Sequence, residues 1–297
     1  MWTWCCLSDV LVLATGSQVP FPGKDTDVDA LASEMKYRAA LSVTKRADRI
    51  AIVGGGPVGV ELAGEISFAF PGKDVTLFHS GPSLLSKTGL KEGVSSALAQ
   101  QLAARGVTLV LGETVDTDAL DAVARDERKA EGAEALPDEV VTGPVMVSTQ
   151  QGTAWEADVV FRCTGATVNH SCYSVGWLAD ATGDDGRLRV TGTLQVEGKK
   201  DVYAIGDCGA AGELHTMYTA QQQGRYVAEV LAKQAMKPQV EVKPYERHPK
   251  FMLVPLGPKG GAGQLPTGQV ATGAVVSLGK GKDLYYSDVK KMMRVKR

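Results

Sequence analysis

Three glycines at residues 54, 56 and 59 have the spacing of a loop that binds a phosphate group. They follow four apolar residues, 50–53, three of which are β-branched, and such a run is typical of a buried parallel strand. In a strand-turn-helix unit the first glycine allows the tight turn, the second lets a phosphate approach the backbone, and the third lets the helix pack on the strand. The stretch therefore predicts a dinucleotide site made by Gly54, Gly55, Gly56, Pro57, Val58 and Gly59.

The residues after this loop support the prediction. A helix is expected over residues 57–70, with Pro57 in its first turn, and its free N–H groups and positive dipole end would face a pyrophosphate. A second strand is expected at residues 75–78. His79 lies 20 positions after Gly59, where the side chain that contacts the ribose belongs. Because strict NAD enzymes place a carboxylate there, His79 predicts weak discrimination between NADH and NADPH.

Length and composition exclude several classes of protein. The chain has 297 residues, 44% of them hydrophobic and 22% charged, which predicts a soluble globular protein of about two domains. A net charge of −2 gives no reason to expect a nucleic-acid partner, and no apolar run has the length of a membrane span. The five cysteines have neither the spacing of a disulfide framework nor that of a metal site, which favours a reducing compartment and no bound metal.

Two expected strands end on the dipeptide Thr-Gly, one at residues 9–17 and the other at 157–165. We interpret them as the two points where the chain crosses between a host domain and an inserted nucleotide domain, residues 45–165. Within this domain the pattern continues with a helix at 91–105 and a strand at 107–111, the order of a doubly wound parallel sheet. The acidic segment 116–139 lacks a clear period and is expected to be a solvated insertion.

The host domain resumes beyond this domain. A strand at residues 201–207 ends on Gly-Asp and precedes a helix at 216–234. Asp207 suits a hydrogen bond to a sugar-like hydroxyl group, although it could instead cap the helix. After residue 238 we expect a small α+β tail domain, with strands at 251–256, at 270–278 and at 284–286 and a basic end at 290–297.

Four motifs together resemble the two-dinucleotide-domain flavoprotein reductases. They are Ala-Thr-Gly-Ser at 14–17, the glycine stretch at 54–65, Cys-Thr-Gly at 163–165, and Val-Tyr-Ala-Ile-Gly-Asp-Cys at 202–208. Three shorter stretches look most like the apoptosis-inducing-factor-like, ferroptosis-suppressor type of NAD(P)H:quinone reductase, a relative of type II NADH dehydrogenases. These are Leu-Phe-His-Ser at 77–80, Leu-Gln-Val-Glu-Gly at 194–198 and Lys-Gly-Lys-Asp-Leu at 280–284.

The resemblance implies an FAD-dependent enzyme that passes hydride from NAD(P)H to the flavin and electrons on to a quinone-like acceptor. It places Glu61 near the nicotinamide and Thr164 and Gly165 under it, while Thr15, Gly16 and Asp207 would contact the flavin. Lys280 matches a family lysine near the flavin. Glu61 and Lys280 are the two candidate catalytic residues, with a solvated Glu61 and a surface Lys280 as the alternatives.

The resemblance also implies a division of the chain. The family begins with an FAD-binding unit of roughly a hundred residues that is not recognisable here, so we expect an N-terminally truncated chain that holds FAD poorly. The expected parts are a remnant of the FAD-binding domain at 1–44, the NAD(P)-binding domain at 45–165, a second FAD-binding segment at 166–238, and the small C-terminal domain at 239–297.

Two alternatives to a quinone reductase stay open at this point. One is a nucleotide-binding remnant without flavin chemistry, and the other is a disulfide reductase. The expected location is the cytoplasm, a membrane surface or the mitochondrial surface. In the latter two cases the basic C-terminal domain would make a peripheral membrane contact.

Overall fold

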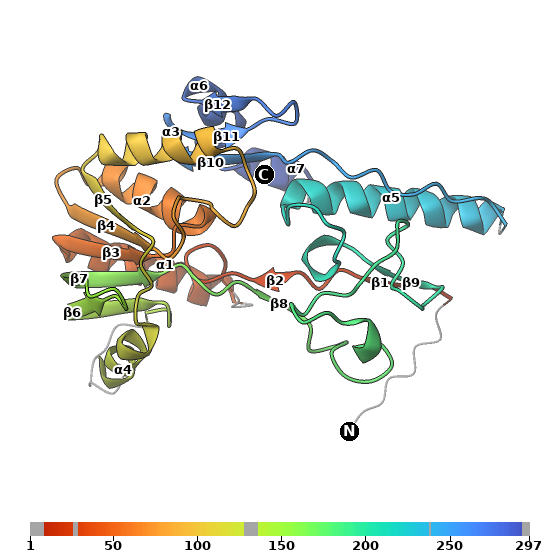
Figure 1. Ribbon diagram of the computed structural model, residues 1–297, viewed down its shortest axis with the longest axis horizontal. Helices are drawn as coiled ribbons and strands as arrows, with labels where there is room; N and C mark the ends of the chain where they lie inside the picture. The colour runs from red at the N-terminus through yellow and green to blue at the C-terminus, as the bar shows by residue number, and fades with distance from the viewer. Residues whose placement is uncertain (1–8, 26–28, 128–135, 238, 293–297) are drawn as a thin grey trace. The chain divides into compact units, whose positions relative to one another are not determined.

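The computed structural model describes residues 9–25, 29–127, 136–237 and 239–292. The chain forms two compact units (Figure 1). The first unit combines residues 1–18 with 166–250, and the second combines residues 19–165 with 251–297. The division into four segments drawn from the sequence stays a prediction, and each unit is described here by itself.

A five-stranded sheet with the order β5-β4-β3-β7-β6 forms the centre of the second unit. Four of its strands are parallel, and β6 joins the edge antiparallel to β7. This is the Rossmann-like α/β arrangement expected from the sequence, with an added antiparallel edge strand. The strands are β3 (Arg49–Val53), β4 (Asp74–His79), β5 (Val107–Leu111), β6 (Val140–Ser148) and β7 (Ala154–Arg162).

Both faces of this sheet are covered, which is why β3 is apolar at successive positions. Ile50 and Ile52 belong to the core under α2 and α3, whereas Ala51 and Val53 belong to the core that includes α4. Figure 1 shows α2 and α3 on one side of the sheet and α4 on the other. The helices are α1 (Ala30–Arg46), α2 (Pro57–Ala69), α3 (Glu92–Ala103) and α4 (Thr117–Glu127).

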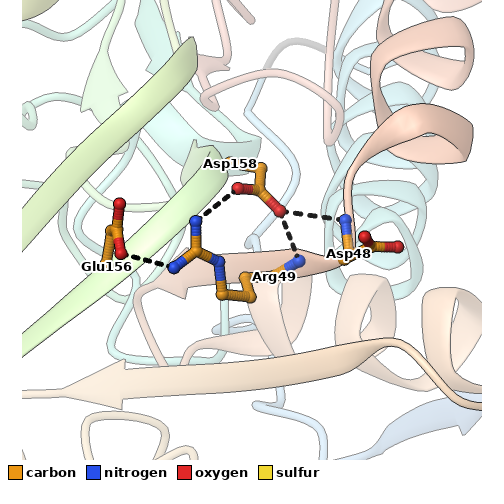
Figure 2. Close-up of polar contacts among 4 residues, drawn as sticks. All are labelled: Asp48, Arg49, Glu156 and Asp158. Atoms are coloured by element: carbon orange, nitrogen blue, oxygen red, sulfur yellow. Dashed lines mark hydrogen bonds and ion pairs between the residues drawn. The ribbon is translucent and has the colours of Figure 1, made fainter.

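A cluster of charged groups holds β3 against β7 (Figure 2). Arg49 pairs with Glu156 at 2.5 Å and with Asp158 at 2.7 Å. The other Asp158 oxygen accepts the backbone N–H groups of Asp48 and Arg49 at 3.0 and 2.8 Å. These hydrogen bonds from Arg49 lower the pKa of Asp158 to about 2. The cluster fixes the strand register in which Val53 lies beside Arg162, so both strands end at the same edge.

The C-terminal segment packs on α2 and α3. It forms the antiparallel sheet β10 (Met252–Leu256), β11 (Gly260–Gln264) and β12 (Val270–Thr272), followed by α6 (Ala274–Val276), a π-helical turn and α7 (Tyr286–Met292). Val254 and Leu256 enter the same core as Ile50. The strands expected at 270–278 and 284–286 are therefore largely wrong, because the chain turns helical after Thr272. Of the basic end, residues 293–297 lie outside the described residues.

The first unit is built on two short strand pairs and one long helix, α5 (Met217–Met236). The strands β1 (Leu11–Leu13) and β9 (Val202–Ala204) run parallel, and β2 (Ser17–Gln18) pairs antiparallel with β8 (Thr167–Val168). We expected residues 9–17 to be a buried strand, but Leu11 and Val12 are 36% and 39% exposed because β1 pairs with β9 on one side. Within the described ranges, no helix of either unit is long and apolar enough to cross a membrane.

One more expectation is wrong. Residues 117–127 of the acidic segment are not a solvated insertion but the helix α4, which buries Leu120 and Ala124 against the sheet. The rest of that segment includes residues 128–135, which lie outside the described residues.

Candidate functional site

Strand register brings the turns of the second unit together. Val53 of β3 lies beside Phe78 of β4 and Arg162 of β7. Because these three strands are parallel and end at the same edge, the glycine loop, His79 and the turn at 163–165 follow one another there. Ligands of open α/β sheets bind at this carboxyl edge.

The glycines of the loop have different structural roles. Gly54 has φ of +122°, and a Cβ atom there would lie 2.8 Å from the carbonyl oxygen of Cys163. A Cβ atom on Gly59 would overlap the carbonyl oxygen of Gly54. These two glycines are thus required by packing of the turn itself.

Gly56 differs, because no contact among the described residues requires a glycine there. Its φ of −76° and ψ of −179° suit any residue, and a Cβ atom there would meet no atom within 4 Å. Pro57 is the first residue of α2, and the N–H groups of Val58 and Gly59 lie in its first turn, where a helix leaves such donors free for a ligand. Open space beside free donors and a helix N-terminus fits the pyrophosphate of a dinucleotide.

His79 occupies the end of β4, as expected, and packs on the glycine loop. Its Nδ1 accepts the N–H of Gly55 at 3.2 Å, so the neutral ring carries its proton on Nε2, which lies 3.1 Å from the Ser86 hydroxyl oxygen. Burial, followed by the nearby Lys87, lowers the pKa of His79. In this tautomer the Nε2–H donates to the Ser86 hydroxyl oxygen, so a ligand oxygen would have to share this donor with Ser86 or replace Ser86, while the acceptor nitrogen is used by Gly55.

Glu61 and Lys280 form an ion pair. The Lys280 Nζ lies 2.5 Å from Glu61 Oε1, and the two side chains are 22% and 24% exposed. Burial raises the pKa of Glu61, and Lys280 opposes this effect. The structure therefore supports neither a solvated Glu61 nor a surface Lys280. Glu65, one turn further along α2, is half-buried, and burial raises its pKa as well.

The turn after β7 lies behind the glycine loop. Cys163 is buried, and burial raises the pKa of its thiol to about 12. Thr164 is exposed, and Gly165 has φ of +88° with no atom within 4 Å of a Cβ placed on it. The two residues expected under the nicotinamide therefore lie at the surface of the turn, with open space next to Gly165.

In the first unit, the other predicted residues also gather in one place. Asp207 follows β9, and its Oδ2 accepts a hydrogen bond of 2.5 Å from the Ser17 hydroxyl group. Thr15 and Gly16 precede Ser17, and Asn169 holds this turn by donating to the Thr15 carbonyl group at 2.9 Å. The two Thr-Gly motifs belong to different units. Thr15 and Gly16 lie in the first unit, and Thr164 and Gly165 lie in the second.

A hollow of about 410 Å³ lies beside Asp207. It is bounded by Gly16, Gly206, and Thr216 and Met217, which are the N-cap and the first residue of α5. Thr216 caps α5 by accepting the N–H of Thr219, so the alternative role of Asp207 as the cap of this helix is wrong. A shallow, largely apolar hollow with one carboxylate and a helix N-terminus fits the ring and ribityl parts of a flavin.

Sequence reasoning missed several residues around this hollow. Ser17 belongs to the Ala-Thr-Gly-Ser motif and could have been named from it, but Asn169, Glu213 and Gln223 carry no spacing signal. They come into contact with the site only through the fold.

Known proteins resemble this chain along most of its length. The model of the pyridine nucleotide-disulphide oxidoreductase family matches residues 6–224. The chain is 33% identical to ferroptosis suppressor protein 1 of Taeniopygia guttata over 279 residues, covering 93% of this chain and 69% of that protein. It is 33% identical to the Homo sapiens protein of the same name, covering 96% and 71%, and 28% identical to apoptosis-inducing factor homolog A of Dictyostelium discoideum, covering 86% and 63%.

Solved structures show the same fold. A water-forming NADH oxidase from Lactobacillus brevis superposes with a TM-score of 0.57 at 20% identity, over 86% of this chain and 52% of the oxidase. A ferredoxin reductase from Rhodopseudomonas palustris superposes with a TM-score of 0.56, also at 20% identity, over 82% and 55%. The chain thus spans about half the length of these structures.

These matches agree with the motifs in the sequence. The expected fold class, the flavoprotein reductase family and its cofactors, FAD and NAD(P)H, are confirmed. The chain belongs to the pyridine nucleotide-disulphide oxidoreductase family, whose members are oxidoreductases that use FAD together with NAD(P)H.

Proposed function

We propose that this protein oxidises NAD(P)H and passes the electrons through FAD to a small quinone-like acceptor. The main observation that supports the proposal is that one chain contains two sites that suit parts of a dinucleotide. One is the open glycine loop at Gly56, and the other is the hollow beside Asp207. Bound FAD would supply the chemistry, since a flavin accepts a hydride and can release its electrons to a different acceptor.

The second unit would bind the nicotinamide cofactor. Backbone N–H groups in the first turn of α2 would hold the pyrophosphate, and the Nε2–H of His79 would donate to the ribose or its 2′-phosphate in place of the Ser86 hydroxyl oxygen that it faces without a ligand. Lys280 would keep Glu61 ionised and fixed in direction near the nicotinamide, because the pair is half-buried and only 2.5 Å apart. Thr164 and Gly165 would lie beneath the same ring.

The first unit would bind the flavin. Ser17 donates to one oxygen of Asp207 and leaves the other free to accept a ribityl hydroxyl group. Thr15 and Gly16 would contact the ring. The start of α5 would direct its N–H groups at the ring carbonyl oxygens.

The acceptor is proposed from the resemblance of the stretches at 77–80, 194–198 and 280–284 to the quinone-reductase type. The three described cysteines are free, with Cys163 and Cys208 buried and Cys172 exposed. They do not decide the acceptor, because the resemblance places the reactive thiol pair of a disulfide reductase in the first FAD-binding unit of the family.

One experiment tests the function and its main alternatives. The purified chain is expected to carry little flavin of its own, and with FAD added in excess it is expected to bind FAD and to oxidise NADH faster with a soluble quinone than with oxidised glutathione. NAD(P)H binding without any flavin binding would favour the nucleotide-binding remnant. Faster turnover with oxidised glutathione would favour the disulfide reductase.

We also propose that the C-terminal segment makes a peripheral contact with an anionic membrane, in the cytoplasm or at the mitochondrial surface. Leu278, Leu284 and Tyr286 are 79%, 53% and 64% exposed, and basic residues including Lys282 and Lys291 lie on the same segment. Each such basic residue is worth about 1 kcal/mol near anionic lipid. Co-sedimentation with anionic vesicles should fall when Leu278 and Leu284 are replaced by serine but not in Met236→Ser, a control whose apolar side chain is at least as exposed as theirs. Equal co-sedimentation of all forms would exclude this contact.

A further inference from the structure

A buried glutamine lies directly behind the Asp207 turn. Gln223 of α5 is only 3% exposed, and its Oε1 accepts the N–H of Gly206 at 2.7 Å. Gly206 has φ of +69° and opens the 3-10 turn Gly206–Cys208, which contains Asp207. A side-chain acceptor from the neighbouring helix thus holds the first N–H of this turn.

The amide of Gln223 is itself fixed by a carboxylate. Its Nε2 donates to Glu213 Oε2 at 2.9 Å, and Glu213 Oε1 accepts the backbone N–H of His248 at 2.5 Å. A flipped amide would place Nε2 against the Gly206 N–H and Oε1 against the carboxylate. Both contacts would then be unfavourable, so the chemistry of the two partners sets the orientation of Gln223.

The three bonds form one continuous relay. It runs from the His248 N–H through Glu213 and Gln223 to the Gly206 N–H, all within the first unit. On the far side of Gly206, Asp207 receives the Ser17 hydroxyl group at 2.5 Å. Ser17 and the relay therefore hold the Asp207 turn from two independent directions.

We propose that Gln223 and Glu213 are positioning residues for FAD binding, which act by holding Gly206 so that Asp207 faces the ribityl chain. The proposal rests on the proposed function of this hollow as the flavin site. Neither residue need touch the flavin: Gly206 and Asp207 line the hollow, whereas Gln223 and Glu213 are not among its lining residues.

Exchanging the amide of Gln223 and the carboxylate of Glu213 gives a direct test. Gln223→Glu sets two carboxylates against each other, and Glu213→Gln leaves a second donor facing either Gln223 or the His248 N–H. Each single variant breaks one buried bond. The double variant Gln223→Glu with Glu213→Gln restores all three bonds, because the new carboxylate accepts from Gly206 and from the new amide, whose oxygen accepts from His248.

FAD titration of the purified chain, followed by flavin fluorescence, should show binding weakened about ten- to a hundredfold in each single variant. The double variant should return to within about threefold of the parent. NADH binding in the second unit should stay constant in every form. Gln222→Glu makes the same chemical change one residue earlier on α5 and is the control, expected to bind FAD as the parent does.

Hydrogen exchange measured without flavin tests, independently of FAD binding, whether the relay holds the Gly206 N–H. The Gly206 amide should exchange faster in both single variants and regain its protection in the double variant. Unchanged exchange in the single variants, or a double variant no better than either, would overturn the proposal. If the parent chain binds no FAD while exchange follows the expected pattern, the relay stands as a structural device. Its role in flavin binding would then be refuted together with the proposed function.

Discussion

Gly56→Val is the substitution that best separates ligand binding from folding. Gly56 is the N-cap residue of α2, with extended backbone angles that valine adopts readily, and a Cβ there meets no protein atom within 4 Å. Valine is a poorer N-cap than glycine by up to about 1 kcal/mol. It also restricts the unfolded chain, which stabilises by about 0.4–1 kcal/mol. The two effects offset, so we expect the free energy of unfolding to change by less than about 1 kcal/mol.

The expected effect on nicotinamide binding is much larger. The valine side chain would fill the space where the pyrophosphate approaches the backbone. It would remove the contact with the helix N-terminus, worth up to ~2 kcal/mol, and at least one hydrogen bond to a charged group, worth ~1.5–3 kcal/mol. A total loss between about 1.5 and about 5 kcal/mol weakens binding by a factor between about ten and several thousand.

The assay is a fluorescence titration with NADH, beside thermal unfolding of the same preparation. Gly59→Ala is the matched control. The Cβ atom that this substitution adds would overlap the Gly54 carbonyl oxygen, so this variant should be destabilised by at least about 1–3 kcal/mol. If Gly56→Val binds NADH as the parent does, the pyrophosphate does not lie at this loop and the assignment is refuted.

Three further predictions concern other groups. His79→Glu should shift the ratio of the NADH and NADPH dissociation constants toward NADH. The parent ratio should lie within about tenfold (~1.4 kcal/mol), His79→Gln should change it little, and a parent preference above a hundredfold for NADH would contradict the argument. Asp158 has a depressed pKa, so its stabilisation of the sheet is complete above the ordinary value near 3.8 and is lost as pH falls toward 2. Asp158→Asn should therefore lower the melting temperature at pH 6 more than at pH 2.5, whereas Asp74→Asn, at an exposed carboxylate of the same sheet, should lower it at neither pH. Iodoacetamide at pH 8 should label exposed Cys172 and leave Cys163 unmodified in mass spectra, since the pKa of the Cys163 thiol is about 12; labelling of Cys163 at the same rate would show that the turn opens.

The glycine loop and its strands could be predicted because their causes are local. Ile50 and Ile52 alternate with Ala51 and Val53 between two cores, so every position of the strand had to be apolar. Parallel strands end at one edge, so the positions of His79 and Thr164 near the loop followed from their places at strand ends. The bounds of these elements could be predicted from short-range patterns alone, and the predicted bounds were close to those observed.

Elements whose apolar face is narrow could not be predicted in the same way. In α4 the side chains of Leu120 and Ala124 reach the core, while acidic residues and alanines elsewhere in the segment hide the period. Similarly, Leu278 and Leu284 look like strand residues because they are apolar, but the structure leaves both exposed. The conformation of these residues depends on how they pack against other segments, and the local sequence carries no information about that packing.

Contacts between distant residues are the part of the site that required the fold. Lys280 is 219 positions from Glu61, and Ser17 is 190 positions from Asp207. Both carboxylates were predicted from their motifs, but neither partner could be assigned to them by spacing. The chemistry of each carboxylate depends on that partner. An isolated Glu61 on a helix would be a solvated anion, whereas Glu61 beside Lys280 is a half-buried charge that is held in one direction.

His79 shows why this difference matters for function. Its position predicted a ribose contact in which the neutral ring accepts one hydrogen bond, and the structure corrects this expectation. The Gly55 N–H already donates to Nδ1, so Nε2 must carry the proton in the neutral ring. A donor can serve a ribose oxygen and a phosphate oxygen equally well, whereas a carboxylate rejects the phosphate. The predicted weak discrimination between NADH and NADPH thus depends on a backbone donor of the glycine loop itself, which sets the tautomer of the histidine next to it.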